Sequence, residues 1–288
     1  MHLSEVFKSG KFAVTSEIGP PKGVQIEPIL EEYEPLKGRV DGVNVTDLQS
    51  SVMRLGSLAV CHLLKERGFE PIFQLTCRDR NRLALQSDII SAYVLGIENM
   101  LLLTGDYPTL GDHPEAKPVF DLDSVQLLEA ARRLQEGYDM AGKPLQGAPK
   151  FCLGAVVNPG ADPIEPQIIK MEKKVKAGAQ FFQTQAVYEV DKFAKFMDAV
   201  KYLQVPVMAG IVLLKSAGMA RFMNKNVAGV HVPDNLIEEM EKTDNKVKTS
   251  IQIAARLINE LHDFCQGVHI MSIGWDKHVP AVLDAAGL

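Results

Sequence analysis

Residues 12–21 read FAVTSEIGPP, an apolar run that ends in the carboxylate of Glu17 and is followed at once by Gly19, Pro20 and Pro21. The run is typical of a β-strand, and the two prolines, which cannot donate a backbone hydrogen bond, indicate where the strand ends. Seven more short apolar runs recur along the chain, and most precede a turn and a stretch with helical spacing. The eight predicted strands cover residues 12–17, 42–46, 71–76, 99–103, 151–157, 181–184, 207–211 and 268–273.

Strands that alternate with helices favour a parallel sheet, and eight such units favour a closed (β/α)8 TIM barrel of the α/β class. The 288 residues fit one such domain, which typically has about 250 residues, so residues 1–288 are predicted to form a single barrel. The tail, residues 275–288, is predicted to be a short helix that covers one end of the barrel. Because active sites of these barrels lie where the strands end, the residues directly after each run are the candidates for function.

The predicted helices follow the strands. They cover residues 26–36, 52–67, a segment that ends near 95, 124–137, 165–177, a segment from Ser216 to about 224, and 236–264 with a break near 243–245. Residues 107–121 are rich in Pro and Gly and are predicted to form a long loop over the top of the barrel, where lids usually lie.

Composition excludes several classes of protein. The net charge is −5 with both signs interspersed, which is not the footprint of a nucleic-acid-binding protein. No apolar run approaches the length needed to span a bilayer, and residues 1–11 lack the apolar core of a signal peptide. The four cysteines are far apart and form no C-x-x-C pair, which favours buried thiols in a reducing cytoplasm. The seven histidines are scattered and form no ligand pair, so no metal site is predicted.

Three candidates for chemistry end predicted strands: Glu17, Asp106 and Gln185. A carboxyl group between apolar walls suits a general acid, a second carboxylate in a polar setting stays charged, and a neutral amide binds a heterocycle without adding charge. Taken singly, each could equally serve only to bind loop amides at the barrel rim.

Four strings in these regions resemble the methylenetetrahydrofolate reductase family. TSEIGPP at residues 15–21 resembles the family's first-strand Glu before a double proline, and QLTC at 74–77 is similar to its third-strand HLTC. LTGD at 103–106 is similar to its LRGD, and KVKAGA at 174–179 with QTQ at 183–185 resembles its KVxAGA and TQ strings. The four stretches occur in family order over most of the chain.

The resemblance implies a flavin, FAD with FMN as an alternative, bound at the barrel mouth, and reduction of 5,10-methylenetetrahydrofolate to 5-methyltetrahydrofolate. It implies that Glu17 protonates folate N10, that Asp106 lies beside flavin and pterin, and that Gln185 binds the folate. The cofactor-binding positions that it implies are Thr46, Gln74, Thr104, Gly105, Asp106, Asn158, Asp162 and Lys174.

The sequence departs from the family pattern at several positions. Gln74 stands in place of His, Thr104 in place of Arg, and Asp162 in place of the His of a His-Pro pair. Residues 212–218 lack the aromatic residue that helps nicotinamide-using members receive the dinucleotide. The electron donor is therefore either NAD(P)H or a partner redox subunit, within a homo- or hetero-oligomer. A barrel subunit of a larger redox complex and a non-flavin, aldolase-type barrel enzyme are the alternative functions.

Overall fold

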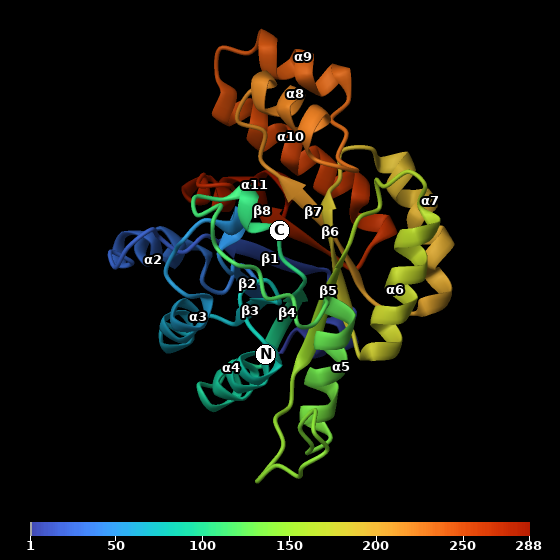
Figure 1. Cartoon of the computed structure of the whole chain (residues 1–288). Coiled ribbons are helices and arrows are strands. Elements are labelled where there is room, and N and C mark those ends of the chain that lie inside the picture. The colour runs from blue at the N-terminus through green and yellow to red at the C-terminus, as the bar shows by residue number, and fades with distance from the viewer. Residues whose placement is uncertain (1) are drawn as a thin grey trace.

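The computed structural model describes residues 2–288, which form a closed barrel of eight parallel strands in sequential order, β1 to β8 (Figure 1). The strands are β1 (Ala13–Ile18), β2 (Gly42–Val45), β3 (Pro71–Thr76), β4 (Asn99–Leu103), β5 (Cys152–Val157), β6 (Phe181–Ala186), β7 (Val207–Val212) and β8 (Gly267–Met271). The predicted (β/α)8 TIM barrel is confirmed, and every predicted strand ends within two residues of the observed one. Runs that are buried on both faces produce this agreement, because their continuous apolar character is a strong signal.

Helices surround the barrel, and a group of three, α8 to α10, projects from it near β7 (Figure 1). The α-helices are α1 (Leu3–Lys8), α2 (Glu27–Tyr33), α3 (Ser57–Glu66), α4 (Arg82–Val94), α5 (Ser124–Gln135), α6 (Glu165–Ala177), α7 (Val190–Val200), α8 (Ala217–Asn226), α9 (Asp234–Lys242), α10 (Lys246–Leu261) and α11 (Val279–Ala286). Short 3-10 helices are η1 (Glu34–Leu36), η2 (Gln49–Ser51), η3 (Pro108–Leu110), η4 (Lys201–Leu203), η5 (His262–Phe264) and η6 (Asp276–His278).

Several helix boundaries follow the local chemistry that predicts them. Ser216 caps α8, since its hydroxyl accepts a hydrogen bond from the Met219 backbone N–H over 3.1 Å. The predicted break separates α9 from α10, and α6 has the predicted bounds. The predicted start of α3 at residue 52 is wrong. The short helix η2 ends at Ser51, residues 52–56 are not helical, and α3 begins only at Ser57.

The C-terminal tail lies elsewhere than predicted, and an N-terminal helix that the sequence did not predict takes its place. The short tail helix, α11, is confirmed, but it packs beside α10 and η1 in the outer ring of helices and does not cover a barrel end. Its buried face, Val279, Val282 and Leu283, has the one-sided spacing that suits that layer. The N-terminal end of the barrel is closed instead by α1, whose Leu3 and Val6 are buried.

The lower interior of the barrel is apolar and tightly filled. Leu3 and Val6 of α1 pack there against inward-facing side chains of six strands: Ala13, Ile72, Leu101, Cys152, Phe181 and Met208. Gly154 makes room for the Phe181 ring, since a Cβ on residue 154 would lie 2.3 Å from it. A polar layer lies above this plug, toward the carboxyl ends of the strands, and the functional candidates lie at that end.

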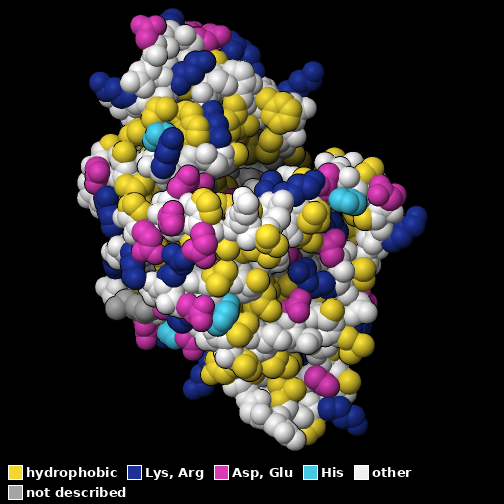
Figure 2. Space-filling model, turned by 90° about the vertical axis from the view of Figure 1, so that its left-hand side faces the viewer, with side chains coloured by type: hydrophobic (Ala, Val, Ile, Leu, Met, Phe, Trp, Pro, Cys, Tyr) yellow, Lys and Arg dark blue, Asp and Glu magenta, His cyan; other side chains and the backbone are white. Residues whose placement is uncertain are grey.

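Figure 2 shows one face of the molecule, on which acidic and basic side chains alternate with hydrophobic ones. That face therefore presents no large area of a single charge. Within residues 2–288, none of the helices has the length and apolar character that crossing a membrane requires.

Candidate active site at the mouth of the barrel

A cavity of about 440 Å³ lies at the carboxyl ends of the strands. Its volume is within the usual range for small-molecule sites, about 300–1,000 Å³. Nine of the ten residues that the sequence singles out line it: Glu17, Thr46, Gln74, Thr104, Gly105, Asp106, Asn158, Lys174 and Gln185. Asp162 does not line the cavity; it is exposed on the loop after β5.

Glu17 lies near the end of β1, and its side chain is 14% exposed. Gln74 Nε2 donates to Glu17 Oε2 over 3.2 Å, and Gln49 Nε2 donates to Oε1 over 3.5 Å. His269 Nε2 lies 3.6 Å from Oε2. The carboxyl group is therefore held between amide and imidazole groups and faces the cavity, as a proton donor to a bound ligand must.

Thr46 follows β2 and is only 2% exposed. Its Oγ1 is buried and has no hydrogen-bond partner among the described residues. A buried hydroxyl without a partner costs stability. Because Thr46 lines the cavity, this unpaired hydroxyl indicates that a polar ligand group belongs beside it.

Gly105 turns the chain after β4 so that Asp106 reaches the cavity rim. Its φ is +93°, and a Cβ there would lie 3.1 Å from Arg78 Cβ and 3.2 Å from Thr76 Cβ. Both the left-handed backbone and the close packing require glycine. The Asp106 carbonyl accepts hydrogen bonds from Ser51 Oγ and from Arg78 Nη1, which fixes this turn against η2.

Lys174 of α6 is 4% exposed, and its Nζ donates to the Val156 carbonyl over 2.6 Å. Burial, and secondly the nearby charge of Lys170, lowers the pKa of Lys174 to about 8. A cation kept in so dry a position is poised to pair with an anionic ligand group. Three lysines lie close together on α6. Lys170 and Lys174 line the cavity, and Lys173 does not.

Two of the predicted cofactor positions also hold the loops in place. Thr104 Oγ1 accepts from the Ser124 backbone N–H at the start of α5, over 3.2 Å. Asn158 Nδ2 donates to the Ala228 carbonyl over 2.9 Å, and its Oδ1 accepts from the Gly160 N–H. Their side chains are therefore partly committed to neighbouring backbone groups.

Gln185 reaches the cavity through an irregularity in β6. The register between β6 and β7 shifts between Gln183 and Ala186. Thr184 Oγ1 bonds within this bulge, accepting from the Gly210 N–H and donating to the Gln185 carbonyl. Bulges commonly re-aim side chains next to active sites, and here Gln185 is exposed at the rim while Gln183 is buried in the barrel.

Sequence reasoning missed most of the polar groups behind the cavity wall. Asp47, with a fully buried carboxylate, accepts from the Thr76 N–H and hydroxyl and pairs with Arg80 over 2.8 Å. Arg78 is 3% exposed and bonds Asp79, Ser51 and the Leu48 carbonyl. The arginines after β3 therefore neutralise nearby acids. A histidine inside an otherwise apolar strand was the one available signal for His269.

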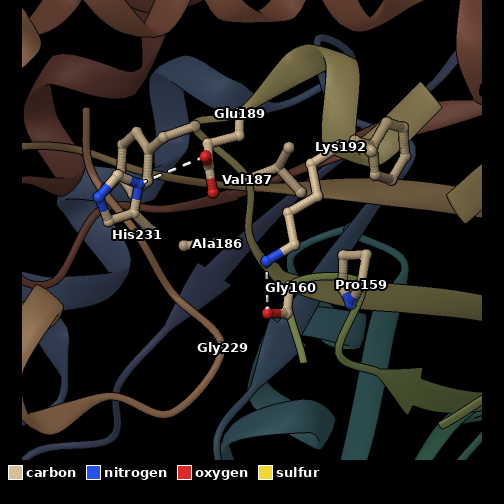
Figure 3. Close-up of a pocket in the computed structure, with 10 residues that line it drawn as sticks. Pro159, Gly160, Ala186, Val187, Glu189, Lys192, Gly229 and His231 are labelled. Atoms are coloured by element: carbon tan, nitrogen blue, oxygen red, sulfur yellow. Dashed lines mark hydrogen bonds and ion pairs between the residues drawn. The ribbon is translucent and has the colours of Figure 1, made fainter. Parts of the chain in front are cut away.

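A second cavity is far smaller. It lies among the loops after β5 and β6 and the α8–α9 loop, where Lys192 donates to the Gly160 carbonyl and His231 faces Glu189 (Figure 3). Its volume of about 20 Å³ holds little more than one water molecule. The mouth of the barrel is therefore the better candidate for a ligand as large as a flavin or a folate.

Residues 2–288 contain no group of three or more His, Cys, Asp or Glu side chains placed to hold a metal ion. The four cysteines are free and buried, as predicted.

Comparisons with known proteins agree with the strings in the sequence. The family model described as methylenetetrahydrofolate reductase matches residues 2–287. A 5,10-methylenetetrahydrofolate reductase of Salmonella typhimurium is 25% identical over 266 residues, which cover 90% of this chain and 83% of that protein. Methylenetetrahydrofolate reductase 2 of Schizosaccharomyces pombe is also 25% identical, over 74% of this chain but only 35% of its own length.

Among solved structures, a Clostridium thermocellum protein has the same fold, with a TM-score of 0.70 and 18% sequence identity. The match covers 99% of this chain and 98% of that one, whose description states that it binds two copies of 5-methyl-5,6,7,8-tetrahydrofolic acid. With a family match over nearly its whole length, the chain belongs to the methylenetetrahydrofolate reductase family of oxidoreductases.

Proposed function

We propose that this chain is a flavin-dependent reductase that converts 5,10-methylenetetrahydrofolate to 5-methyltetrahydrofolate. The observation that carries the proposal is that Glu17, Asp106 and Gln185, from three different strand ends, line one cavity. The family match and the folate bound by the clostridial protein of the same fold support the choice of substrate.

The residues of the cavity fit a flavin. Thr46 offers an unpaired buried hydroxyl, Gln74 and Asn158 offer amides, and Lys174 offers a cation for phosphate. Bound there, a flavin would supply the hydride that the reaction needs. We favour FAD, and FMN stays the alternative because Gln74 and Thr104 replace residues that contact the flavin in the family. The predicted contact of Asp162 with the cofactor has no support from the cavity, because Asp162 does not line it.

The chain's own residues would prepare the substrate. In the closed five-membered ring the methylene carbon is a poor hydride acceptor, and protonation at N10 opens the ring to a 5-iminium cation. Glu17 is the proton donor, since its carboxyl group faces the cavity. Asp106 would stabilise the positive charge of the iminium, and the Gln185 amide would bind the folate without adding charge.

The electron donor is NAD(P)H or a partner redox subunit. The loop after β7 has no aromatic residue between positions 212 and 218, which favours a donor other than a stacked nicotinamide. Stopped-flow reduction of the flavin-loaded protein by NADH, NADPH and reduced ferredoxin distinguishes these donors. The proposal also places the chain in the cytoplasm, in a homo- or hetero-oligomer, and the four free thiols agree with a reducing compartment.

The absorbance spectrum of the purified protein tests the proposal. We expect a flavin band, present on purification or after reconstitution, that bleaches under a reductant and returns when methylenetetrahydrofolate is added. A colourless protein that cannot be reconstituted with FAD or FMN would contradict it. An aldolase-type barrel enzyme would instead turn over its substrate without any flavin.

A further inference from the structure

A chain of hydrogen bonds crosses the inside of the barrel and leads to Glu17. Asn44 of β2 and Gln183 of β6 pair their amides: Asn44 Nδ2 donates to Gln183 Oε1 over 2.8 Å, and Gln183 Nε2 donates to Asn44 Oδ1 over 3.1 Å. Gln183 Nε2 also donates to Thr15 Oγ1 over 3.2 Å, and that oxygen lies 3.0 Å from His269 Nδ1. The other ring nitrogen, Nε2, lies 3.6 Å from Glu17 Oε2.

Every link behind Glu17 is buried. Asn44 and Thr15 are 0% exposed, Gln183 is 2% exposed and His269 is 3% exposed. Buried polar groups of this kind must find their partners within the protein. The number of N–H and O–H protons in this hydrogen-bond chain therefore determines which group donates and which accepts at each link.

Counting those protons assigns the tautomer of His269. Gln183 uses both of its amide N–H groups, one to Asn44 and one to Thr15. The Thr15 hydroxyl, having accepted one of them, has a single proton to donate. Among the described contacts its remaining neighbour is His269 Nδ1, so Nδ1 accepts. A neutral imidazole whose Nδ1 accepts carries its proton on Nε2, the nitrogen that faces Glu17.

The two oxygens of Glu17 then face different groups. Oε2 faces two N–H donors, His269 Nε2 at 3.6 Å and Gln74 Nε2 at 3.2 Å. Oε1 is within 3.5 Å of Gln49 Nε2 alone, and Gln49 is exposed. The His269 contact is longer than a formed hydrogen bond, but catalytic contacts of this length often tighten when substrate binds.

We propose that the buried chain Asn44–Gln183–Thr15 holds His269 as a neutral Nε2–H donor, so that Oε1 of Glu17 is the oxygen that carries and delivers the proton. The delivery step rests on the proposed function. In it the Oε1–H bond breaks as an N–H bond forms at folate N10, and the carboxylate keeps the electron pair and one negative charge. The N–H groups at Oε2 stabilise that charge, while His269 itself neither gives nor takes a proton. His269 and Thr15 are thus positioning residues.

Few ionisable side chains lie near His269. Of the strands that contact β8, namely β1, β6 and β7, only β1 carries an ionisable side chain, and that side chain is Glu17. The other ionisable side chains that line the cavity are Asp47, Arg78, Asp106, Lys170 and Lys174.

Long-range ¹H–¹⁵N NMR of the full-length protein labelled with ¹⁵N-histidine reads the tautomer directly. The His269→Gln spectrum identifies the His269 signals by their loss. We expect the wild-type signals at about pH 8, where an ordinary histidine is neutral, to be those of the Nε2–H form. Thr15→Val should lower the ratio of Nε2–H to Nδ1–H form about tenfold, because one hydrogen bond is removed. Thr15→Ser, which keeps the hydroxyl, should keep the tautomer.

A His269 signal from the cation or from the Nδ1–H form in the wild type would overturn the proposal, as would an unchanged ratio in Thr15→Val. If that variant does not fold, the pair His269→Gln and His269→Phe takes its place. The Gln amide can still donate near the former Nε2 position. We therefore expect the rate constant for flavin reoxidation by folate to fall about tenfold more in the Phe variant, with folate affinity unchanged in both.

Equal losses in the Gln and Phe variants, or a loss of folate affinity without a loss of rate, would also overturn it. The tautomer is read without folate or turnover. A wild-type protein that shows the Nε2–H form but no folate reduction would therefore refute the proposed function while leaving the assignment of His269 in place.

Discussion

Thr46→Val should change stability and cofactor affinity in opposite directions. The Thr46 hydroxyl is buried without a partner in the flavin-free protein, a situation that costs about 1–3 kcal/mol. Val has nearly the same shape and no polar atom. We therefore expect the free energy of unfolding of the flavin-free variant to rise by about 1 kcal/mol. For a domain of this size that is an increase of about 2 °C in Tm.

The same substitution should weaken flavin binding, because the ligand loses one hydrogen bond. A net loss of about 1 kcal/mol corresponds to a Kd about fivefold higher. Thermal unfolding of the flavin-free protein and fluorescence titration with FAD measure the two effects. Thr46→Ser, which retains the hydroxyl, is the matched control and should keep the affinity. A Val variant that is destabilised and binds FAD as tightly as the wild type would refute the role of the hydroxyl.

Three further predictions concern charge. Asp106→Asn should slow folate reduction at least about tenfold while flavin stays bound, because the variant loses the negative charge that favours the iminium; unchanged turnover would remove Asp106 from the mechanism. Lys174→Met should stabilise the flavin-free protein by about 2 kcal/mol at pH 7, because burial lowers the pKa of Lys174 to about 8. Between about pH 8 and pH 10.5 the folded wild type binds fewer protons at Lys174 than the unfolded state, so its free energy of unfolding rises with pH across that window. The extra stability of the Met variant should therefore disappear above about pH 10.5. A difference in denaturant unfolding that does not change with pH would contradict the argument. Arg78→Lys should lower the free energy of unfolding by about 2 kcal/mol, because Lys cannot reproduce the hydrogen bonds of the buried guanidinium group. Arg82→Lys is the control: Arg82 forms a half-exposed pair with Asp121, and its replacement should change the free energy of unfolding by less than about 1 kcal/mol. Equal effects of the two substitutions would show that the Arg78 contacts contribute no extra stability.

Much of the fold could be predicted because its signals are local. The strand runs are apolar on both faces, and Ser216 caps its helix through its own neighbours. The N-terminal helix escaped prediction because a six-residue helix gives too few turns for a periodic signal, even though Leu3 and Val6 lie on one face. The position of the tail helix depends on packing against α10, which is not encoded locally.

The candidate site was predictable where it depends on strand ends. Resemblance and barrel geometry together point to Glu17, Asp106 and Gln185, and the structure brings them to one cavity. The bulge that brings Gln185 to the rim of the cavity, by contrast, depends on the backbone register between β6 and β7. Asp162 stands in place of a family His and lies off the cavity, whereas Asn158, earlier in the same loop, lines it.

The polar chain behind Glu17 could not have been read from spacing. Asn44, Gln183 and His269 lie on strands far apart in the sequence and meet only because the barrel closes between β8 and β1. Asn44 and His269 each look like an isolated polar residue in an apolar run, and Gln183 looks like part of the QTQ string at the strand end. Only their shared hydrogen bonds show that they act together.

Glu17→Gln, assayed in two separate half-reactions, tests the central claim most directly. Stopped-flow absorbance follows reduction of the bound flavin by its donor and, separately, its reoxidation by methylenetetrahydrofolate. The account predicts nearly normal reduction and an almost complete loss of reoxidation, because the amide cannot protonate N10. Equal losses in both half-reactions, or reoxidation at the wild-type rate, would contradict the role of Glu17 as the acid.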